Sequence, residues 1–317
     1  MRAVRVAGPG DVSVLDIPSP EPAHGEVLLE VAATAVCSTD RKFAARGHDS
    51  PRTPGHEVTG RLLDGTVVGV HPEIACRRCQ ACLAGWHNRC PYREALGLDR
   101  DGGFAELVAV PSSQVVPLGD LDPVIATMLE PLACAVHAVE VAGIDTARPA
   151  VVVGAGAMGI LCAWVLQAAG SRVVVCQRSP QRRRLARDLG VNAAIGPDED
   201  PADHLGEPPA AIVVTAPGAE PLAWGLERVA VGGVVHAFAS LPGVVPVDVN
   251  VVHYRHLTLV GSTGSRLQDY ERACDLAASG AIKLERLPHR VVGLDGAPAA
   301  VLDRPPSGVL KTIVAVS

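Results

Sequence analysis

Four cysteines lie close together in the first third of the chain, at Cys76, Cys79, Cys82 and Cys90. Four thiolates at this spacing can surround one Zn²⁺ tetrahedrally and leave no position open, which is typical of a structural site. The alternative is a pair of disulfides. A chain of 317 residues with nine cysteines is far below the cysteine density at which small secreted domains depend on disulfides. We therefore expect one structural zinc ion.

A second set of metal-binding side chains is scattered along the chain, at Cys37, His56, Glu57 and Glu130. One thiolate, one imidazole and one or two carboxylates can hold Zn²⁺ and leave a position for a substrate oxygen, as catalytic zinc requires. The spacing alone does not prove such a site, because a lone cysteine or histidine is more often a packing residue than a ligand.

A glycine-rich segment follows a short apolar run at Val151–Val153. It reads Gly154-Ala155-Gly156-Ala157-Met158-Gly159, which is the pattern G-x-G-x-x-G between a strand and a helix. The first glycine permits a tight turn, the second lets the backbone approach a pyrophosphate, and the third lets the helix pack against the strand. A glycine-rich packing turn is the alternative, but the strand–loop–helix context favours a dinucleotide site.

The end of the next strand bears on the choice of cofactor. NAD-specific sites usually carry an acidic residue there, whereas this chain continues from Cys176 with Gln177-Arg178-Ser179 and then Arg182. A 2′-phosphate would pair with arginines, and the hydroxyl of Ser179 is a further donor. The arginine run could instead be a solvated helix face. The missing carboxylate and the arginines together favour NADP over NAD.

The sequence divides into two regions with different secondary-structure patterns, and these regions must position the candidate metal and cofactor residues. The first 120 residues contain strand-like runs (27–31 and 104–110) and many prolines, which predicts a β-rich, irregular domain. A helix with Pro131 in its first turn follows. From residue 149, apolar strands alternate with helices, which predicts a parallel sheet covered on both faces. The expected strands are 150–153, 172–175, 211–215, 234–237 and 257–260, and the expected helices are 157–169, 180–189 and 220–229.

The residues from about 282 onward again show the pattern of short strands and turns, and they could belong to the first domain. We therefore expect an α/β protein with a discontinuous β-rich domain formed by residues 1–135 and 281–317. Residues 136–280 would form a doubly wound parallel-sheet domain.

Composition excludes several classes of protein. Hydrophobic residues make up 48% of the chain and charged residues 20%, which argues against disorder. A net charge of −6 and an aromatic content of 3% argue against a nucleic-acid partner. Residues 150–166 carry no charge, but the segment is short and glycines interrupt it, so a buried strand and helix explain it as well as a membrane span does. No secretory signal pattern opens the chain, and we expect a cytoplasmic protein.

Six motifs of this chain occur in the order found in the zinc-dependent medium-chain dehydrogenase/reductase family: residues 37–40, residues 55–57, the four-cysteine segment, residues 101–106, residues 130–132 and the glycine loop. The chain resembles that family over nearly its whole length. It looks most like the polyol branch, because Glu130 stands where classical alcohol dehydrogenases would place a cysteine ligand. The resemblance implies a GroES-like catalytic domain, a Rossmann cofactor domain, catalytic and structural zinc, and a homodimer or homotetramer.

The resemblance also assigns roles. Cys37 and His56 match zinc ligands, Glu57 matches a carboxylate that ligates directly or stands behind a ligand, and Glu130 matches a third position, direct or through water. Thr39 matches the hydroxyl that relays the substrate proton. The cofactor residues implied are Gly154, Gly156, Ala157, Met158, Gly159, Gln177, Arg178, Ser179 and Arg182.

The expected activity is hydride transfer between NADP(H) and a secondary alcohol or ketone, with a polyol, sugar-derived or aminocyclitol-type substrate. Two alternatives stay open: a catalytically silent protein that binds NADP and zinc, and a zinc-independent quinone or enone reductase. The chain is shorter than the family pattern between residues 43 and 56 and between 57 and 76, which suggests a more open substrate cleft or a bulkier substrate.

Overall fold

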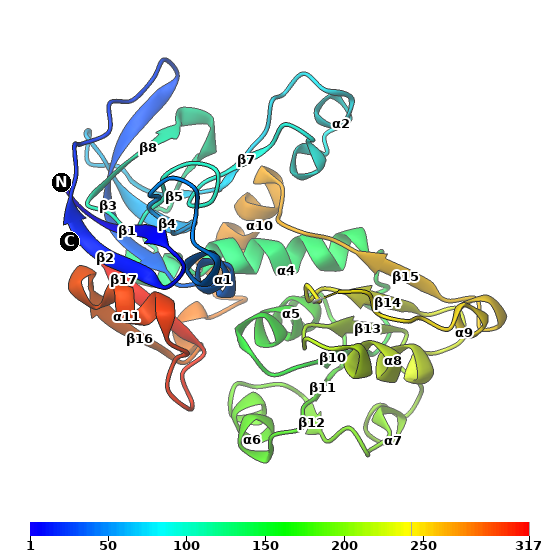
Figure 1. Cartoon of the computed structure of the whole chain (residues 1–317). Helices are drawn as coiled ribbons and strands as arrows, with labels where there is room; N and C mark the ends of the chain where they lie inside the picture. The colour runs from blue at the N-terminus through cyan, green and yellow to red at the C-terminus, as the bar shows by residue number, and fades with distance from the viewer. Residues whose placement is uncertain (242, 317) are drawn as a thin grey trace. The chain divides into compact units, whose positions relative to one another are not determined.

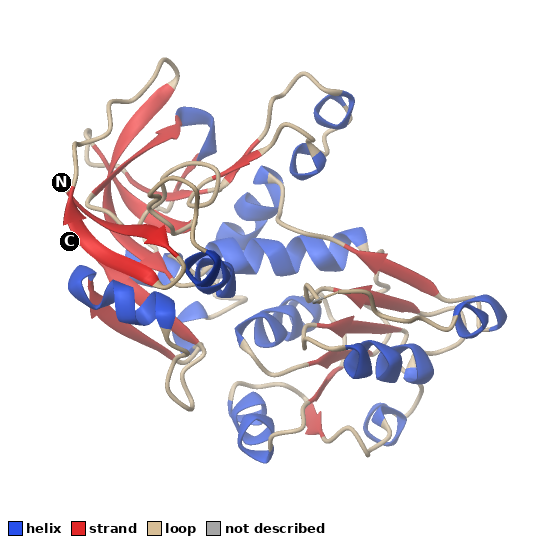
Figure 2. Cartoon of the chain, in the orientation of Figure 1, coloured by secondary structure: helices blue, strands red, loops and turns tan. Residues whose placement is uncertain are grey.

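The computed structural model describes residues 1–241 and 243–316, which divide into two compact units. Unit 1 comprises Met1–Ala133 and Ser265–Ser317, and unit 2 comprises Cys134–Gly264. Figure 1 follows the chain by residue number, and Figure 2 marks its helices and strands. Helix α4 (Leu129–Val141) begins in unit 1 and ends in unit 2. Pro131 lies in its first turn, where a proline lacks no hydrogen bond that the helix needs.

Unit 1 is built on a seven-stranded sheet in the order β16-β17-β3-β4-β5-β9, with β8 also paired to β3. The strands are β3 (Glu26–Ala35), β4 (Glu57–Leu62), β5 (Val67–Val70), β8 (Leu107–Pro111), β9 (Val115–Pro117), β16 (His289–Gly293) and β17 (Lys311–Ala315). Strand β17 pairs antiparallel with β3, so the end of the chain closes the sheet that its beginning starts.

Smaller elements complete unit 1. The hairpin β1 (Arg2–Gly8) and β2 (Asp11–Asp16) and the pair β6 (Glu73–Ile74) and β7 (Glu94–Ala95) form two separate two-stranded sheets. The helices are α1 (Ser38–Arg46), α2 (Gln80–Leu83), α3 (Pro123–Ala126), α10 (Leu267–Ala278) and α11 (Ala297–Leu302). A buried apolar cluster of Leu29, Val58, Val68 and neighbouring residues fills one part of this unit.

Unit 2 contains a six-stranded sheet in which every pairing is parallel, in the order β12-β11-β10-β13-β14-β15. The strands are β10 (Ala150–Val153), β11 (Val173–Cys176), β12 (Ala193–Ile195), β13 (Ala211–Val214), β14 (Val234–Ala237) and β15 (Thr258–Gly261). Strands β10, β11 and β13 are buried along their whole length, as expected for a parallel sheet covered on both faces.

The strand order reverses between β10 and β13, and this reversal places helices on both faces because parallel crossovers are right-handed. Helix α5 contacts β10 and β11, whereas α8 contacts β13 and β14 (Figure 1). The helices of this unit are α5 (Ala157–Ala168), α6 (Pro180–Asp188), α7 (Pro201–Leu205), α8 (Ala219–Arg228) and α9 (Val249–Tyr254). In the described part of the chain, no helix is long and apolar enough to cross a bilayer, and residues 150–166 form β10 and most of α5.

The structure moves the second domain boundary from residue 281 to residue 265. Helix α10 belongs to unit 1 because its Tyr270 is buried and lies against Gly69, and because His71 Nε2 lies 3.1 Å from the carbonyl oxygen of Ser265. The apolar spacing of α10 does not reveal which sheet the helix covers. The strand expected at 104–110 is also shorter, since β8 begins at Leu107 and Ala105 makes only an isolated bridge to Ala3.

Candidate functional site

The four cysteines of residues 76–90, here called the cysteine lobe, come together as expected. All nine cysteines of the chain are free thiols, so the disulfide alternative is not seen. The Sγ–Sγ distances are 3.4 Å for Cys79–Cys82, 3.8 Å for Cys79–Cys90 and 4.0 Å for Cys76–Cys82. Four sulfurs about 2.3 Å from a tetrahedral zinc ion would lie about 3.8 Å apart. The lobe therefore fits one zinc ion.

Cys37, His56 and Glu57 also meet, with one ligand atom from each within 4.8 Å of the others. Cys37 precedes α1 and the other two residues stand at the start of β4, so an N-terminal helix end and a strand end supply the three groups. Sulfur, imidazole nitrogen and carboxylate oxygen form a donor set suited to zinc. Glu57 Oε2 is buried and has no hydrogen-bond partner among the described residues, which also fits a role as a cation ligand.

Asp40 holds the segments of Cys37 and His56 together. Its carboxylate accepts the backbone N–H of Cys37 at 2.8 Å and that of Gly55 at 3.1 Å, and it lies 3.4 Å from His56 Nδ1. A histidine that binds a metal through one ring nitrogen commonly directs the other to a carboxylate, and Asp40 occupies that place. Sequence reasoning did not assign Asp40 this role, although its position three residues after the N-cap Cys37 is a capping-box spacing.

Glu57 is paired with a residue that sequence reasoning missed entirely. Lys311 on β17 contacts Glu57 Oε1 and also lies 3.4 Å from the carbonyl oxygen of Val36. Both side chains of the pair are buried. Burial raises the pKa of Glu57 to about 7, against the opposing effect of Lys311. No local signal marks Lys311, because only the pairing of β17 with β3 brings it here.

The same burial acts on the other two groups. For Cys37, burial raises the pKa, but the hydrogen bond and charge of His56 outweigh it and the net shift is downward. For His56, burial lowers the pKa, but the charge of Asp40 and the bond to Cys37 raise it well above its usual value. These opposite shifts favour a thiolate beside an imidazolium, a pair whose proton a bound cation would displace.

Glu130 and Thr39 are the other two residues that the sequence predicts beside Cys37, His56 and Glu57. Glu130 is buried in the first turn of α4 and near enough to Glu57 for its charge to raise the pKa of Glu57. It is not among the three side chains whose ligand atoms lie within 4.8 Å of one another. Thr39 is half-buried, with Oγ1 3.7 Å from Cys37 Sγ.

In unit 2, the glycine loop has the shape that a pyrophosphate needs. Gly154 has φ +114°, and a Cβ atom on Gly159 would lie 1.9 Å from the carbonyl oxygen of Gly154. By contrast, a Cβ atom on Gly156 would meet only Arg182 Nη1, at 3.8 Å. The first and third glycines are therefore required by the fold itself, whereas the second leaves open space beside the N-terminus of α5. Ala157 and Met158 form the first turn of that helix.

The residues after β11 form a turn that arginines surround. Arg182 Nη1 donates to the carbonyl oxygen of Ala155 in the glycine loop at 3.3 Å, while the side chain of Arg178 is exposed. Ser179 caps α6 by accepting the backbone N–H of Arg182 at 3.4 Å, and Gln177 Oε1 accepts the N–H of Ser179 at 3.1 Å. Arg183 Nη1 donates to the carbonyl oxygens of Gln177 at 2.8 Å and Arg178 at 3.0 Å. This role of Arg183 was not expected from the sequence.

Comparisons with known proteins agree with the structure of both units. Residues 23–120 match the family model of the alcohol dehydrogenase GroES-like domain, and residues 157–279 match that of the zinc-binding dehydrogenases. The chain is 31% identical to L-threonine 3-dehydrogenase from Pyrococcus horikoshii, over 93% of this chain and 92% of that protein. It is 30% identical to L-galactonate-5-dehydrogenase from Escherichia coli K12, over 86% of each. A zinc-binding dehydrogenase from Sinorhizobium meliloti 1021, solved bound to NADP, is similar with a TM-score of 0.92 and 31% identity, covering 99% of this chain and 98% of that one.

Fold, site and relatives define an NAD(P)-dependent alcohol dehydrogenase of the zinc type, with a GroES-like β-rich domain and a Rossmann domain. The chain belongs to the zinc-dependent medium-chain dehydrogenase/reductase family. The family and the fold class expected from the sequence are thereby confirmed.

Proposed function

We propose that the chain transfers a hydride between NADP(H) and a secondary alcohol or ketone, and that the substrate is a polyol, a sugar derivative or an aminocyclitol-type compound. The observation that carries the proposal is the meeting of Cys37, His56 and Glu57 in the GroES-like domain of an alcohol dehydrogenase. These three residues would hold catalytic zinc, and Glu130 would be a further ligand, direct or through water. Zinc bound there supplies a Lewis acid for the substrate oxygen.

Thr39 is the proposed proton relay. Its hydroxyl lies next to Cys37 Sγ and is half-buried, so it can contact both a substrate oxygen and water. Bound NADP⁺ would supply the hydride acceptor for alcohol oxidation, and Thr39 Oγ1 would pass the hydroxyl proton of the substrate to solvent. Buried Asp40 keeps His56 oriented throughout.

The relatives support a hydroxylated substrate. L-Threonine and L-galactonate, the compounds named for two of them, are both secondary alcohols that carry further polar groups. A substrate of this kind needs several hydrogen bonds besides the contact at the reacting oxygen.

NADP preference rests on the turn after β11. No carboxylate stands at the end of that strand, and Arg178, Arg182 and Ser179 offer donors to a 2′-phosphate. The relative solved with NADP bound adds support. The proposed cofactor site also includes Gly154, Gly156, Ala157, Met158, Gly159 and Gln177. Arg178→Asp should weaken NADPH binding far more than NADH binding, and equal effects on both would contradict the preference.

One experiment tests the activity and both metal sites. We propose two zinc ions per chain, so zinc should be quantified in the wild type, in Cys37→Ser and in Cys82→Ser, with NADPH and NADH turnover measured against a panel of alcohols and ketones. Cys37→Ser should retain one zinc and lose turnover, whereas Cys82→Ser should lose the zinc of the cysteine lobe. Full activity of Cys37→Ser would refute the proposed site. Turnover without zinc would instead favour a quinone or enone reductase, and two zinc ions with no turnover would favour a silent binding protein.

We propose a homodimer or homotetramer in solution. Strand β15 is the edge of the six-stranded sheet, and its Leu259 is 39% exposed. An apolar strand edge of this kind pairs readily with another copy. Light scattering on the wild type and on Leu259→Lys would test this, since a monomeric wild type contradicts the proposal.

A further inference from the structure

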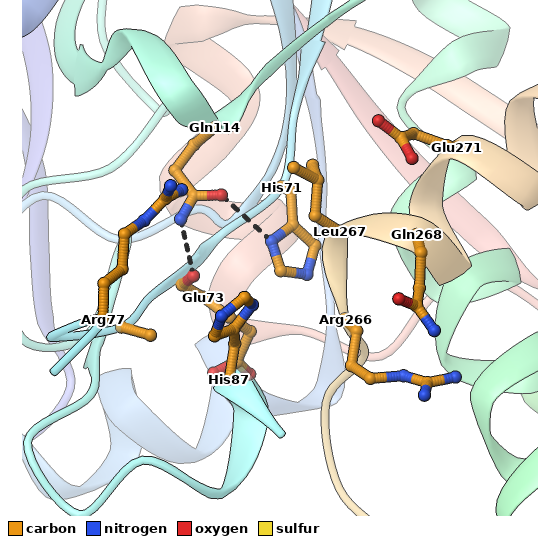
Figure 3. Close-up of a pocket in the computed structure, with 10 residues that line it drawn as sticks. His71, Glu73, Arg77, His87, Gln114, Arg266, Leu267, Gln268 and Glu271 are labelled. Atoms are coloured by element: carbon orange, nitrogen blue, oxygen red, sulfur yellow. Dashed lines mark hydrogen bonds between the residues drawn. The ribbon is translucent and has the colours of Figure 1, made fainter. Parts of the chain in front are cut away.

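A cavity of about 240 Å³ lies in unit 1 between the cysteine lobe and helix α10. Figure 3 shows Arg77 and Gln114 on one side of it, His87 below, and Gln268 and Glu271 of α10 on the opposite side. Eight of its ten lining residues carry polar or charged side chains, so the cavity suits a small polar molecule.

Part of this lining is a rigid network. Gln114 Nε2 donates to the carbonyl oxygen of Glu73 at 2.8 Å, and Gln114 Oε1 lies 3.2 Å from His71 Nδ1 (Figure 3). The carboxylate of Glu73 is paired with Arg93 at 2.9 Å. These polar groups are therefore engaged with one another and hold the cavity open.

Arg266 of the α10 wall is engaged as well. It is buried and forms a bidentate pair with Asp269, with distances of 3.0 Å and 2.7 Å. Its guanidinium also lies 5.2 Å from the ring centroid of Trp86 in the cysteine lobe. The two walls of the cavity are thus tied together.

Arg77 and Glu271 differ from the other charged groups of the lining. Neither has an ion-pair partner within 4.0 Å in residues 1–241 and 243–316, and they stand on opposite walls (Figure 3). A ligand with an anionic group at one end and hydroxyl or amino groups at the other would match this arrangement of charges.

The backbone conformation of Arg77 is a second observation that indicates a role for its side chain. Arg77 has φ +57°, and among the described residues only His256 shares a positive φ without being glycine. The turn between Cys76 and Cys79 imposes this angle, because it directs the backbone N–H groups of Arg77 and Arg78 toward the thiols of Cys82 and Cys76. Glycine adopts such an angle without steric cost, whereas arginine does not. A strained residue whose charged side chain lines a cavity points to a role for that side chain.

We propose that this cavity is an anion-binding subsite in which Arg77 holds a carboxylate or phosphate group of a small hydroxylated molecule. Gln268 and Glu271 on the opposite wall would contact its hydroxyl or amino groups. The proposal rests on the proposed function in one respect, that the molecule is the alcohol substrate.

Titration calorimetry on the zinc-loaded protein without nucleotide tests the subsite directly. The probes are gluconate, sorbitol 6-phosphate and sorbitol, which share a six-carbon hydroxylated chain and differ in the charge at its end. At low ionic strength, gluconate or sorbitol 6-phosphate should bind about 10- to 100-fold more tightly than sorbitol, the range expected for one charge-assisted pair. The tighter of the two identifies the acidic group.

Arg77→Gly should abolish this difference and leave the melting temperature equal or higher, because glycine relieves the backbone strain. Arg78→Ala is the matched control, since Arg78 is the exposed neighbour in the same turn and does not line the cavity. It should bind the probes as the wild type does. The proposal is overturned if no probe binds the wild type, if sorbitol binds as tightly as the charged probes, or if Arg77→Gly binds them unchanged. Retained anion binding with no turnover of any alcohol would contradict the proposed function alone.

Discussion

Lys311 Nζ contacts Glu57 Oε1 across two strand pairings, from β17 past β3 to β4. Both side chains are buried, and the second oxygen of Glu57 has no hydrogen-bond partner among the described residues. A buried ion pair brings a large desolvation cost and is weak evidence for stability in itself. We interpret the pair as holding one oxygen of Glu57 so that the other faces Cys37 and His56.

Lys311→Met should destabilise the metal-free protein by about 3–5 kcal/mol, because it leaves a buried carboxylate without its cation. Added zinc should restore part of this loss, since a cation at Cys37, His56 and Glu57 would balance the same charge. Chemical denaturation with and without zinc measures both effects. Lys42→Met, at an exposed lysine, is the control and should change neither value. An equal gain in stability from zinc in wild type and Lys311→Met would show that Lys311 and the metal are not coupled.

His236 should make the stability of unit 2 depend on pH. It is buried in β14 with Nε2 3.0 Å from Ser262 Oγ, and burial, together with the charge of His137, lowers its pKa to about 4. Its contribution is complete above the unfolded pKa of about 6.5 and is lost as the pH falls toward 4. At pH 5 the loss is about 2 kcal/mol.

Urea unfolding of wild type and His236→Asn at pH 7.5 and pH 5 tests this expectation. The wild type should lose about 2 kcal/mol more than the variant between the two pH values. His24→Asn, at an exposed histidine, should follow the wild type. Parallel losses in wild type and His236→Asn would mean that His236 accepts its proton without cost.

Arg183→Met should weaken NADPH binding about threefold to tenfold by releasing the turn that carries Arg178. Because Arg183 acts through Arg178, the double variant Arg178→Met/Arg183→Met should bind NADPH no more weakly than Arg178→Met. Fluorescence titration gives the four affinities of this cycle for NADPH and another four for NADH, and exposed Arg184→Met is the control. Additive losses would show that Arg183 contacts the phosphate itself, and equal losses for both nucleotides would show a general structural role.

Local patterns predicted most of the framework. The cysteine spacing, the glycine loop and the apolar runs of β10, β11 and β13 each act over a few residues, and the structure has them as expected. Strand β12 and helices α7 and α9, with three, five and six residues, are too short to produce a clear periodicity, and they were not expected.

The features that the sequence did not predict depend on contacts between residues far apart in the chain. Lys311 and Glu57 are 254 residues apart in sequence, and only the antiparallel pairing of β17 with β3 brings them together. The place of α10 in unit 1 likewise depends on where Tyr270 packs, beside Gly69, and not on its own sequence. In the sequence, Arg183 does not differ from its neighbours in an arginine run. Only the structure shows that the turn before it supplies two carbonyl oxygens to its guanidinium group.

Two glycines of the same loop should respond to alanine in opposite ways. Gly159→Ala places a Cβ atom 1.9 Å from the carbonyl oxygen of Gly154, so α5 must move away from β10 and the protein should lose several kcal/mol of stability. Gly156→Ala meets only Arg182 Nη1 at 3.8 Å and has φ −88°, which alanine adopts freely. Its melting temperature should equal that of the wild type. Its affinity for NADPH and NADH should nevertheless fall by at least about tenfold, because the new methyl group occupies the space where backbone approaches the pyrophosphate. Melting curves and nucleotide titrations on both variants separate the two roles, and undiminished nucleotide affinity in Gly156→Ala would place the pyrophosphate elsewhere.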